Sequence, residues 1–124
     1  MTEINPQLAP YVNNCELPFW LVPKIQKLGI NGLFIKDFGG PGMNNLEAGV
    51  ILYEFAKHDA SIATFVQVHN SIGTYVIDQC GNEEQRSRLL KETINMDRIV
   101  CFGLTEPLNG SDASGLRTCA TRTE

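Results

Sequence analysis

The chain has 124 residues, 43% hydrophobic and 19% charged, with a formal net charge of -4 at pH 7. This length and composition suit one domain with a buried core and exclude a disordered chain. The acidic balance argues against a nucleic-acid partner, which needs a basic face. No apolar run reaches the ~20 residues that span a bilayer, so we expect no membrane span.

The cysteines of the chain are widely and irregularly spaced. No pair has the close spacing of zinc ligands, so we expect no metal site. The chain also lacks the cysteine density and the signal peptide of a disulfide-rich secreted domain, which predicts an intracellular protein with reduced thiols. Because free cysteine is usually buried, we expect most of these thiols in the core. The cysteines are Cys15, Cys80, Cys101 and Cys119.

The first part of the chain predicts short, interrupted elements. Residues 4–16 are broken by two prolines and predict only the ragged end of a helix. Residues 17–29 carry apolar side chains at helical spacing, and Gly29 is well placed as a left-handed stop. Residues 33–42 predict an extended piece closed by a glycine-rich turn.

Two longer helices follow. Residues 44–59 predict a helix that Asn45 can cap. Asp59 then caps a second helix that runs to Gly81, and the apolar side chains on several sides of this helix predict that it is buried among other helices. His69 lies inside it, where two hypotheses remain open: a packed, hydrogen-bonded structural histidine, or a side chain that lines a ligand pocket.

A third long helix is predicted over residues 82–95. Asn82 and Gln85 have the spacing of a capping box, in which each side chain binds the other residue's backbone N–H. The charged stretch 82–88 is typical of a solvated helix face.

The pattern changes at Asp97. Residues 98–106 are short, β-branched and aromatic, and predict a strand. Residues 107–115 predict a loop, and residues 116–124 alternate apolar and polar side chains like a second strand. We therefore predict a mainly α fold, with a helical domain over residues 1–96 and the first strands of an incomplete β domain over residues 97–124.

The loop after the first predicted strand has the chemistry of a ligand site. Backbone N–H groups become free where a strand ends, Thr105 and Ser111 add hydroxyls, and Gly110 allows close approach. These groups suit a planar heterocycle or a phosphate. The alternative is a plain turn, because Asn, Gly, Ser and Asp are common in turns, and Asp112 then forms an Asx turn.

The sequence FGLTEPLNGSDASGL, from Phe102 onward, resembles the signature of the acyl-CoA dehydrogenase family. HDASIATFVQVHNSIG and CGNEEQRSRLLKE resemble two successive helices of the family's N-terminal domain. The resemblance covers residues 8–124. Its particular form is most similar to glutaryl-CoA dehydrogenases and plant-type short-chain acyl-CoA oxidases.

The resemblance implies a fold and an activity. Family members have a helical N-terminal domain, a β-rich middle domain and a C-terminal helical bundle, usually in a homotetramer. They remove a proton from the α-carbon of an acyl-CoA and pass a hydride to FAD, as in fatty acid β-oxidation. We therefore expect FAD as cofactor, acyl-CoA as substrate, further copies of the chain or a full-length relative as partners, and a mitochondrial or peroxisomal location.

The resemblance also implies roles for particular residues. The backbone at Leu104 and Thr105 would bind the pyrimidine edge of the flavin, with the Thr105 hydroxyl near N5. Phe102 would lie beside the flavin and the acyl pocket. Gly110 and Ser111 would lie where the cofactor phosphates and the CoA arm pass, so that Ser111 contacts both cofactor and substrate.

Two departures from the family pattern matter. The family's general base is a glutamate of the C-terminal bundle, which is absent from this sequence, and Glu106 does not replace it. We therefore expect no catalytic residue in the chain and no turnover by the chain alone. Ala63 stands where glutaryl-specific members carry an arginine, so a dicarboxylic substrate is disfavoured. The alternative hypothesis is a non-catalytic remnant that serves as a structural or interaction module.

Overall fold

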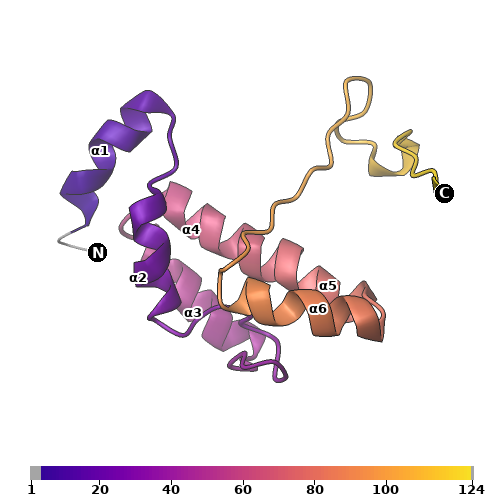
Figure 1. Ribbon diagram of the computed structural model, residues 1–124. Coiled ribbons are helices and arrows are strands. Elements are labelled where there is room, and N and C mark those ends of the chain that lie inside the picture. The colour runs from indigo at the N-terminus through magenta and orange to yellow at the C-terminus, as the bar shows by residue number, and fades with distance from the viewer. Residues whose placement is uncertain (1–3, 124) are drawn as a thin grey trace.

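The computed structural model describes residues 4–123 and is mainly helical, which confirms the predicted fold class (Figure 1). Within these residues, two 3-10 turns, η1 (Phe19–Leu21) and η3 (Ala113–Gly115), and one π-helix, η2 (Val68–Thr74), accompany the α-helices. The α-helices are α1 (Asn5–Asn14), α2 (Val22–Gln26), α3 (Asn45–Ala56), α4 (Ala60–Gln67), α5 (Tyr75–Cys80) and α6 (Glu83–Ile94).

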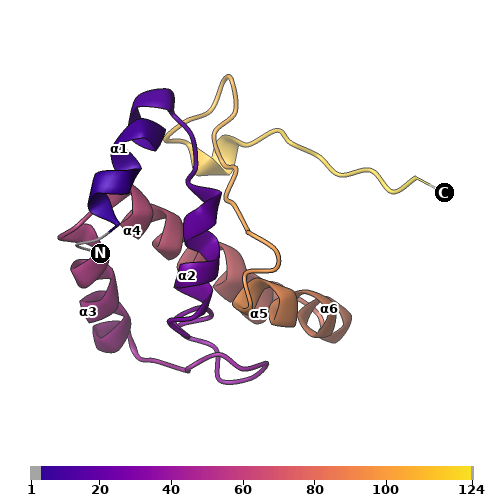
Figure 2. The ribbon, with the colours of Figure 1, turned by 60° about the vertical axis from the view of Figure 1, so that its left-hand side comes forward.

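The helices pack around two groups of buried apolar side chains. The larger group joins α1, η1, α2, α3 and α4, with Met96 at its edge, and the smaller one joins α6 to Ile35. Figure 2 shows α1, α4 and α3 at the left, α2 in the middle, and α5 with α6 at the right. The members of the larger group are Leu8, Leu21, Ile25, Phe55, Ile62, Ala63, Val66 and Met96.

The N-terminal region is more ordered than the sequence predicts. Residues 5–14 form a complete helix, α1, although Pro10 lies inside it. Proline removes one helical hydrogen bond but its φ is compatible with a helix. Burial of Leu8 in the larger core group stabilises α1 despite this loss. Gly29, the predicted left-handed stop, does have a positive φ of 64°.

Side-chain caps set the starts of the long helices. Asn44, not the predicted Asn45, caps α3, and its Oδ1 accepts hydrogen bonds from the N–H groups of Leu46 and Glu47 at 2.9 and 3.1 Å. Glu47 Oε2 accepts in return from the Asn44 N–H at 2.8 Å, and this capping-box spacing distinguishes Asn44 from its neighbour Asn45. Asp59 caps α4, as predicted, by accepting from the Ile62 N–H at 2.8 Å.

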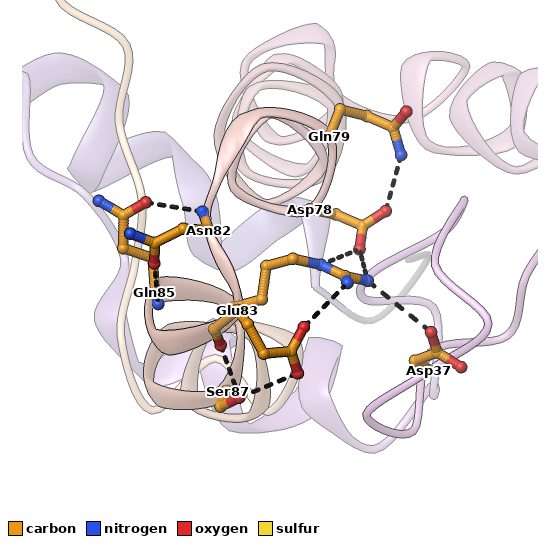
Figure 3. A network of polar contacts seen from close by, with 8 residues as sticks. Asp37, Asp78, Gln79, Asn82, Glu83, Gln85 and Ser87 are labelled. Atoms are coloured by element: carbon orange, nitrogen blue, oxygen red, sulfur yellow. Dashed lines mark hydrogen bonds and ion pairs between the residues drawn. The ribbon is translucent and has the colours of Figure 1, made fainter.

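The predicted capping box of the third long helix is confirmed. Asn82 Oδ1 accepts from the Gln85 N–H, Gln85 Oε1 accepts from the Asn82 N–H, and both distances are 2.9 Å (Figure 3). Such reciprocal bonds satisfy two helix-end donors that the helix itself leaves free.

The charged stretch at the start of α6 is not simply a solvated face. Arg86 donates to the Asp78 carboxylate at 2.8 Å, and both side chains are largely covered, with exposed fractions of 27% and 12%. Asp37 and Glu83 approach the same guanidinium at 3.7 Å (Figure 3). The side-chain hydrogen bond to Asp78 is the main cause that raises the pKa of Arg86. This ion-pair network joins α5, α6 and the loop before α3.

The predicted continuous helix from Asp59 to Gly81 is interrupted by the π-helix η2. A π-turn adds one residue per turn and rotates the following side chains, and such turns are frequent at functional sites. Here the interruption brings two successive polar side chains, His69 and Asn70, into full burial with exposed fractions of 0% and 1%. Periodicity alone did not predict this change.

The predicted strands at residues 98–106 and 116–124 are wrong for the described residues, and Glu124 lies outside them. Over residues 4–123 the structure has no β-strand, and an isolated bridge joins Glu106 to Asn109. After α6 the chain runs out as an extended segment that ends in a loop away from the helices (Figure 1). Extended segments become strands only when a neighbour pairs with their backbone groups, and none does so here.

The prediction that most cysteines are buried is also wrong. All four thiols are free, as predicted, but exposed. Cys15 and Cys80 lie at helix ends, while Cys101 and Cys119 lie on the segment that leaves the helices. Among the described residues no helix is long and apolar enough to cross a membrane.

Candidate functional site

The candidate site is the segment that follows α6, and its direction is set where that helix ends. The N–H of Met96 donates to the Thr93 carbonyl at 2.9 Å, and the N–H of Asp97 donates to the Glu92 carbonyl at 2.9 Å. Met96 is left-handed, with φ 55°. These two bonds form a Schellman motif, which turns the chain sharply out of the helix.

Val100 is the next fixed point of the segment. Its N–H donates to Nδ1 of His69 at 3.2 Å, and its side chain covers Gly73. The segment is therefore attached to the π-helix η2 before it reaches the residues with site chemistry.

Thr105 and its neighbours are open to a ligand. Phe102 is 53% exposed, Thr105 is exposed and Leu104 is half-buried. In the described part of the chain, neither the backbone N–H groups of Leu104 and Thr105 nor the Thr105 hydroxyl has a hydrogen-bond partner. A run of free donors on extended backbone suits a planar ligand with ring-nitrogen and carbonyl acceptors.

Gly110 and Ser111 lie further along, at the exposed end of the loop. The space where a side chain of Gly110 would lie is empty, with no atom within 4 Å of an added Cβ. The Ser111 hydroxyl is exposed and its carbonyl accepts from the Ala113 N–H at 3.1 Å. The structure brings these two residues together with Thr105 on one loop.

Glu106 closes this loop, a role that the sequence did not indicate. Its Oε2 accepts from the Arg117 N–H at 2.9 Å and its Oε1 accepts from the Thr118 N–H at 2.8 Å and from the Thr118 hydroxyl. The Thr118 hydroxyl, followed by the two backbone N–H groups, is the main cause that lowers the pKa of Glu106 to about 2. The carboxylate is thus fully engaged and is a poor proton acceptor.

The inside of the loop is held by two further polar side chains. Asn109 pairs with Glu106 through the backbone, and its Nδ2 donates to the Gly115 carbonyl at 2.6 Å. Asp112 accepts from the Gly115 N–H at 3.1 Å and from the Ser114 hydroxyl at 2.9 Å. The predicted Asx-type role of Asp112 is confirmed. The loop is thus held by its own polar bonds, while Thr105, Gly110 and Ser111 are exposed.

His69 proves to be a structural histidine, as the first of the two hypotheses proposed. It is fully buried, and both ring nitrogens are bonded: Nδ1 to Val100, and Nε2 to the Thr93 carbonyl at 2.9 Å. Asn70, its neighbour, accepts from the Gly32 N–H at 2.6 Å. The sequence signal that could have identified this pair is two adjacent polar residues inside an otherwise apolar helix.

An apolar cavity of about 500 Å³ lies apart from this loop. It opens between α2 and α3 and is lined mainly by aliphatic side chains, with Lys24, Glu54 and His58 as its polar members. Among residues 4–123 no group of His, Cys, Asp and Glu is arranged to hold a metal ion.

The fold and the site together define a helical domain that sends a pre-formed polar loop out from its last helix. The family model described as "Acyl-CoA dehydrogenase, N-terminal domain" matches residues 1–97. The chain belongs to the acyl-CoA dehydrogenase family.

Relatives of known name are similar over most of the chain. An isobutyryl-CoA dehydrogenase, mitochondrial, of Dictyostelium discoideum is 39% identical over 97 residues, which are 77% of this chain and 23% of the relative. An acyl-CoA dehydrogenase of Bacillus subtilis is 34% identical over 121 residues, which are 97% of this chain and 32% of the relative. The chain therefore spans about a quarter to a third of the length of these relatives.

Solved structures agree in fold. The glutaryl-CoA dehydrogenase of Mycobacterium smegmatis superposes with a TM-score of 0.88 at 37% identity, over 97% of this chain and 31% of that one. A glutaryl-CoA dehydrogenase of the same organism, solved in complex with FADH2, gives a TM-score of 0.87 at 32% identity, over 94% of this chain and 30% of that one.

Proposed function

We propose that the chain is a portion of an FAD-dependent acyl-CoA dehydrogenase or oxidase and supplies one edge of its flavin site. The observation that carries this proposal is the set of free donors at Leu104 and Thr105, on a loop that Glu106 holds closed, in a chain of this family. A relative of similar fold was solved with FADH2, which supports the choice of cofactor.

The residues of the segment and its loop would contact different parts of the cofactor and substrate. Leu104 and Thr105 would hold the flavin ring through backbone N–H groups and the Thr105 hydroxyl, and exposed Phe102 would cover an apolar part of the ligand. Gly110 leaves room for the cofactor phosphates and the CoA arm, and Ser111 offers a hydroxyl to them. Bound FAD would supply the capacity to accept a hydride, while the protein positions it and tunes its environment.

The chain's own carboxylate beside this site does not act as the base. Both oxygens of Glu106 accept hydrogen bonds, and its pKa of about 2 makes it too weak to take an α-proton at neutral pH. We therefore propose that the base comes from another part of the enzyme, and that the isolated chain does not turn over acyl-CoA.

Flavin binding is the direct test of the proposal. We expect the chain to bind FAD in a fluorescence titration, and we expect Thr105→Val, which removes a hydroxyl while keeping its shape, to weaken binding several-fold. Thr64→Val is the matched control, because the Thr64 hydroxyl is used inside α4 at 2.8 Å from the Ala60 carbonyl. Equal affinity of wild type and Thr105→Val, or no FAD binding by wild type, would contradict the proposal.

The substrate is proposed to be an acyl-CoA without a distal carboxylate. Ala63, which stands at the position of the arginine in glutaryl-specific relatives, is only 7% exposed and packs in the larger core group. A buried methyl group cannot pair with a carboxylate. In enzyme that contains this chain, glutaryl-CoA should therefore be a much poorer substrate than a neutral acyl-CoA of similar length, and equal rates would contradict this step.

The exposed apolar face of α3 supports the second candidate function, an interaction module. Leu46, Val50 and Tyr53 are 77%, 55% and 64% exposed. Apolar residues exposed in this number on one helix are typical of a surface that another chain covers. The proposed partner is a second copy of the chain or a full-length relative. A stable stoichiometric complex in light scattering, together with failure to bind FAD, would favour this module over the flavin-site portion.

The proposed location in the cell is based on the names of the relatives. Relatives from Dictyostelium discoideum and Bos taurus are named mitochondrial, while others are bacterial. We keep mitochondrion and peroxisome as the proposed locations, and imaging of a tagged chain against organelle markers tests them.

A further inference from the structure

The starting observation is the bonding of a fully buried histidine ring between three parts of the chain. His69 belongs to the π-helix η2, its Nε2 lies 2.9 Å from the Thr93 carbonyl of α6, and its Nδ1 lies 3.2 Å from the Val100 nitrogen. A backbone carbonyl only accepts and a backbone N–H only donates. Nε2 must therefore carry the proton and Nδ1 must carry none, so the ring is neutral.

The Thr93 carbonyl has a second role in the same place. It accepts from the N–H of Met96, whose left-handed backbone turns the chain out of α6. The ring thus binds the carbonyl that closes the helix and, four residues after Met96, the N–H of Val100 in the outgoing segment. Both ends of the turn are tied to one side chain.

Gly73 also fixes the position of the outgoing segment, through its contact with Val100. A Cβ placed on Gly73 would lie 2.7 Å from both Cβ and Cγ1 of Val100, which is too close for two carbon atoms. Val100 therefore rests directly on the backbone of η2, where only glycine leaves room. His69 and Gly73 are both presented by the π-helix, one through polar bonds and the other through its missing side chain.

We propose that His69 is a positioning residue, which in its neutral, Nε2-protonated form fixes Val100 and thereby the course of the flavin-edge segment from Cys101 to Thr105. This inference rests on the proposed function for what the segment binds. The attachment of Val100 itself does not depend on that function.

Protonation of the ring is incompatible with this arrangement. A proton on Nδ1 would turn the acceptor of the Val100 N–H into a donor that faces another donor. Burial, opposed only by the hydrogen bond to Thr93, lowers the pKa of His69 and keeps the ring neutral. The charged side chains close to its partners in the sequence are Glu92 and Arg98, which bind each other and are 42% and 65% exposed, and Asp97, which is exposed.

The attachment is tested in the chain by amide hydrogen exchange and by nitrogen NMR of the imidazole ring. In wild type we expect a proton on Nε2 alone and a protected Val100 amide. His69→Leu should raise Val100 exchange at least roughly tenfold, while His69→Gln, whose amide can both accept and donate, should restore part of the protection. His58→Gln, at an exposed histidine, is the matched control and should leave Val100 unchanged.

Gly73→Ala provides a second route to the same result, because it displaces Val100 without altering the ring. Leu90, fully buried in the smaller core group, reports in every variant whether the fold is intact. Faster exchange at Val100 with Leu90 still protected supports the attachment. The attachment is overturned by a proton on Nδ1 in wild type, or by equal Val100 exchange in wild type and His69→Leu. It is also overturned if both His69→Leu and Gly73→Ala lose the fold.

FAD affinity then separates the two proposals. If wild type binds FAD, a several-fold weaker affinity in His69→Leu with partial recovery in His69→Gln supports the positioning role. Unchanged affinity, despite a released Val100, overturns that role. If wild type does not bind FAD, the proposed function and the positioning role both fail, and Val100 exchange still decides the attachment.

Discussion

Glu106 binds Thr118 twice, through the backbone N–H and through the side-chain hydroxyl. These bonds join two residues on opposite sides of the loop that carries Gly110 and Ser111. The loop therefore has its own polar framework and does not depend on a β-ladder for its shape.

This framework predicts the pH range over which the loop stays closed. The pKa of Glu106 is lowered to about 2 from an ordinary value of 4.5, so closure is complete above about pH 4.5 and is lost as the pH falls through about 2. NMR chemical shifts of the Arg117 and Thr118 amides should follow this titration. Glu106→Ala should leave both amides exposed at neutral pH, with exchange several-fold faster than in wild type.

The control for the loop is a glutamate on the solvent side of α6. Glu84 pairs with Arg88 and its side chain is 82% exposed. Glu84→Ala should leave the amides of Arg117 and Thr118 as they are in wild type. If these amides instead stay protected at pH 1.5, or in Glu106→Ala, the carboxylate does not close the loop.

The start of α6 offers a measurable stability difference. Asn82→Ala removes the side-chain acceptor of the capping box and should lower the free energy of unfolding by ~1 kcal/mol. Asn82→Asp keeps an acceptor and adds a negative charge at the positive end of the helix, so it should cost little. Urea denaturation followed by circular dichroism measures both, and an alanine variant as stable as wild type would exclude the cap.

Two glycines on different helices, Gly49 in α3 and Gly73 in η2, should respond oppositely to alanine. Gly49 lies inside α3 with no atom within 4 Å of an added Cβ, so Gly49→Ala should stabilise the protein by ~0.5–1 kcal/mol. Gly73 has Val100 at 2.7 Å, so Gly73→Ala should destabilise it. Thermal denaturation of the two variants checks the pair, and the same sign for both would contradict the packing described here.

Thiol accessibility provides a chemical check on the C-terminal segment. All four cysteines are free and exposed, so the native protein should react with four equivalents of a thiol reagent without a denaturant. Cys101→Ser and Cys119→Ser should each remove one fast equivalent. A slow equivalent that disappears in Cys101→Ser would show that another chain or element covers the segment in solution.

Structural features with a local signal in the sequence were predictable. The cap at Asp59 and the capping box of Asn82 and Gln85 depend on residues within one turn, and both are confirmed. The family and the mainly helical fold were also predictable. The residues proposed to bind the flavin stay predictions, as does the domain boundary after residue 96, although the family model ends at residue 97.

Structural features that depend on partners distant in the sequence were not predictable. Residues 98–106 have the composition of a strand, but pairing requires a neighbour that the described chain does not provide. The π-helix depends on Asn70 reaching the Gly32 N–H, 38 residues away, and on His69 reaching Val100. The loop-closing role of Glu106 likewise needs the backbone at Thr118, so no short motif could reveal it.

The neutral His69 ring also predicts how stability depends on pH. Burial lowers its pKa below the ordinary 6.5, so its contribution to stability is fully present above about pH 6.5 and is lost as the pH falls toward the folded-state value. The unfolded chain takes up the proton first, and each pH unit in that interval costs at most ~1.4 kcal/mol. Comparison with His69→Gln isolates this term, because other groups titrate equally in both proteins.

Chemical denaturation between pH 7.5 and 5 provides the measurement. The difference in unfolding free energy between wild type and His69→Gln should shrink as the pH falls, because only wild type loses the histidine contribution. His58→Gln, which replaces an exposed ring, should run parallel to wild type. A constant difference across this range would mean that the His69 ring is not held neutral between Thr93 and Val100.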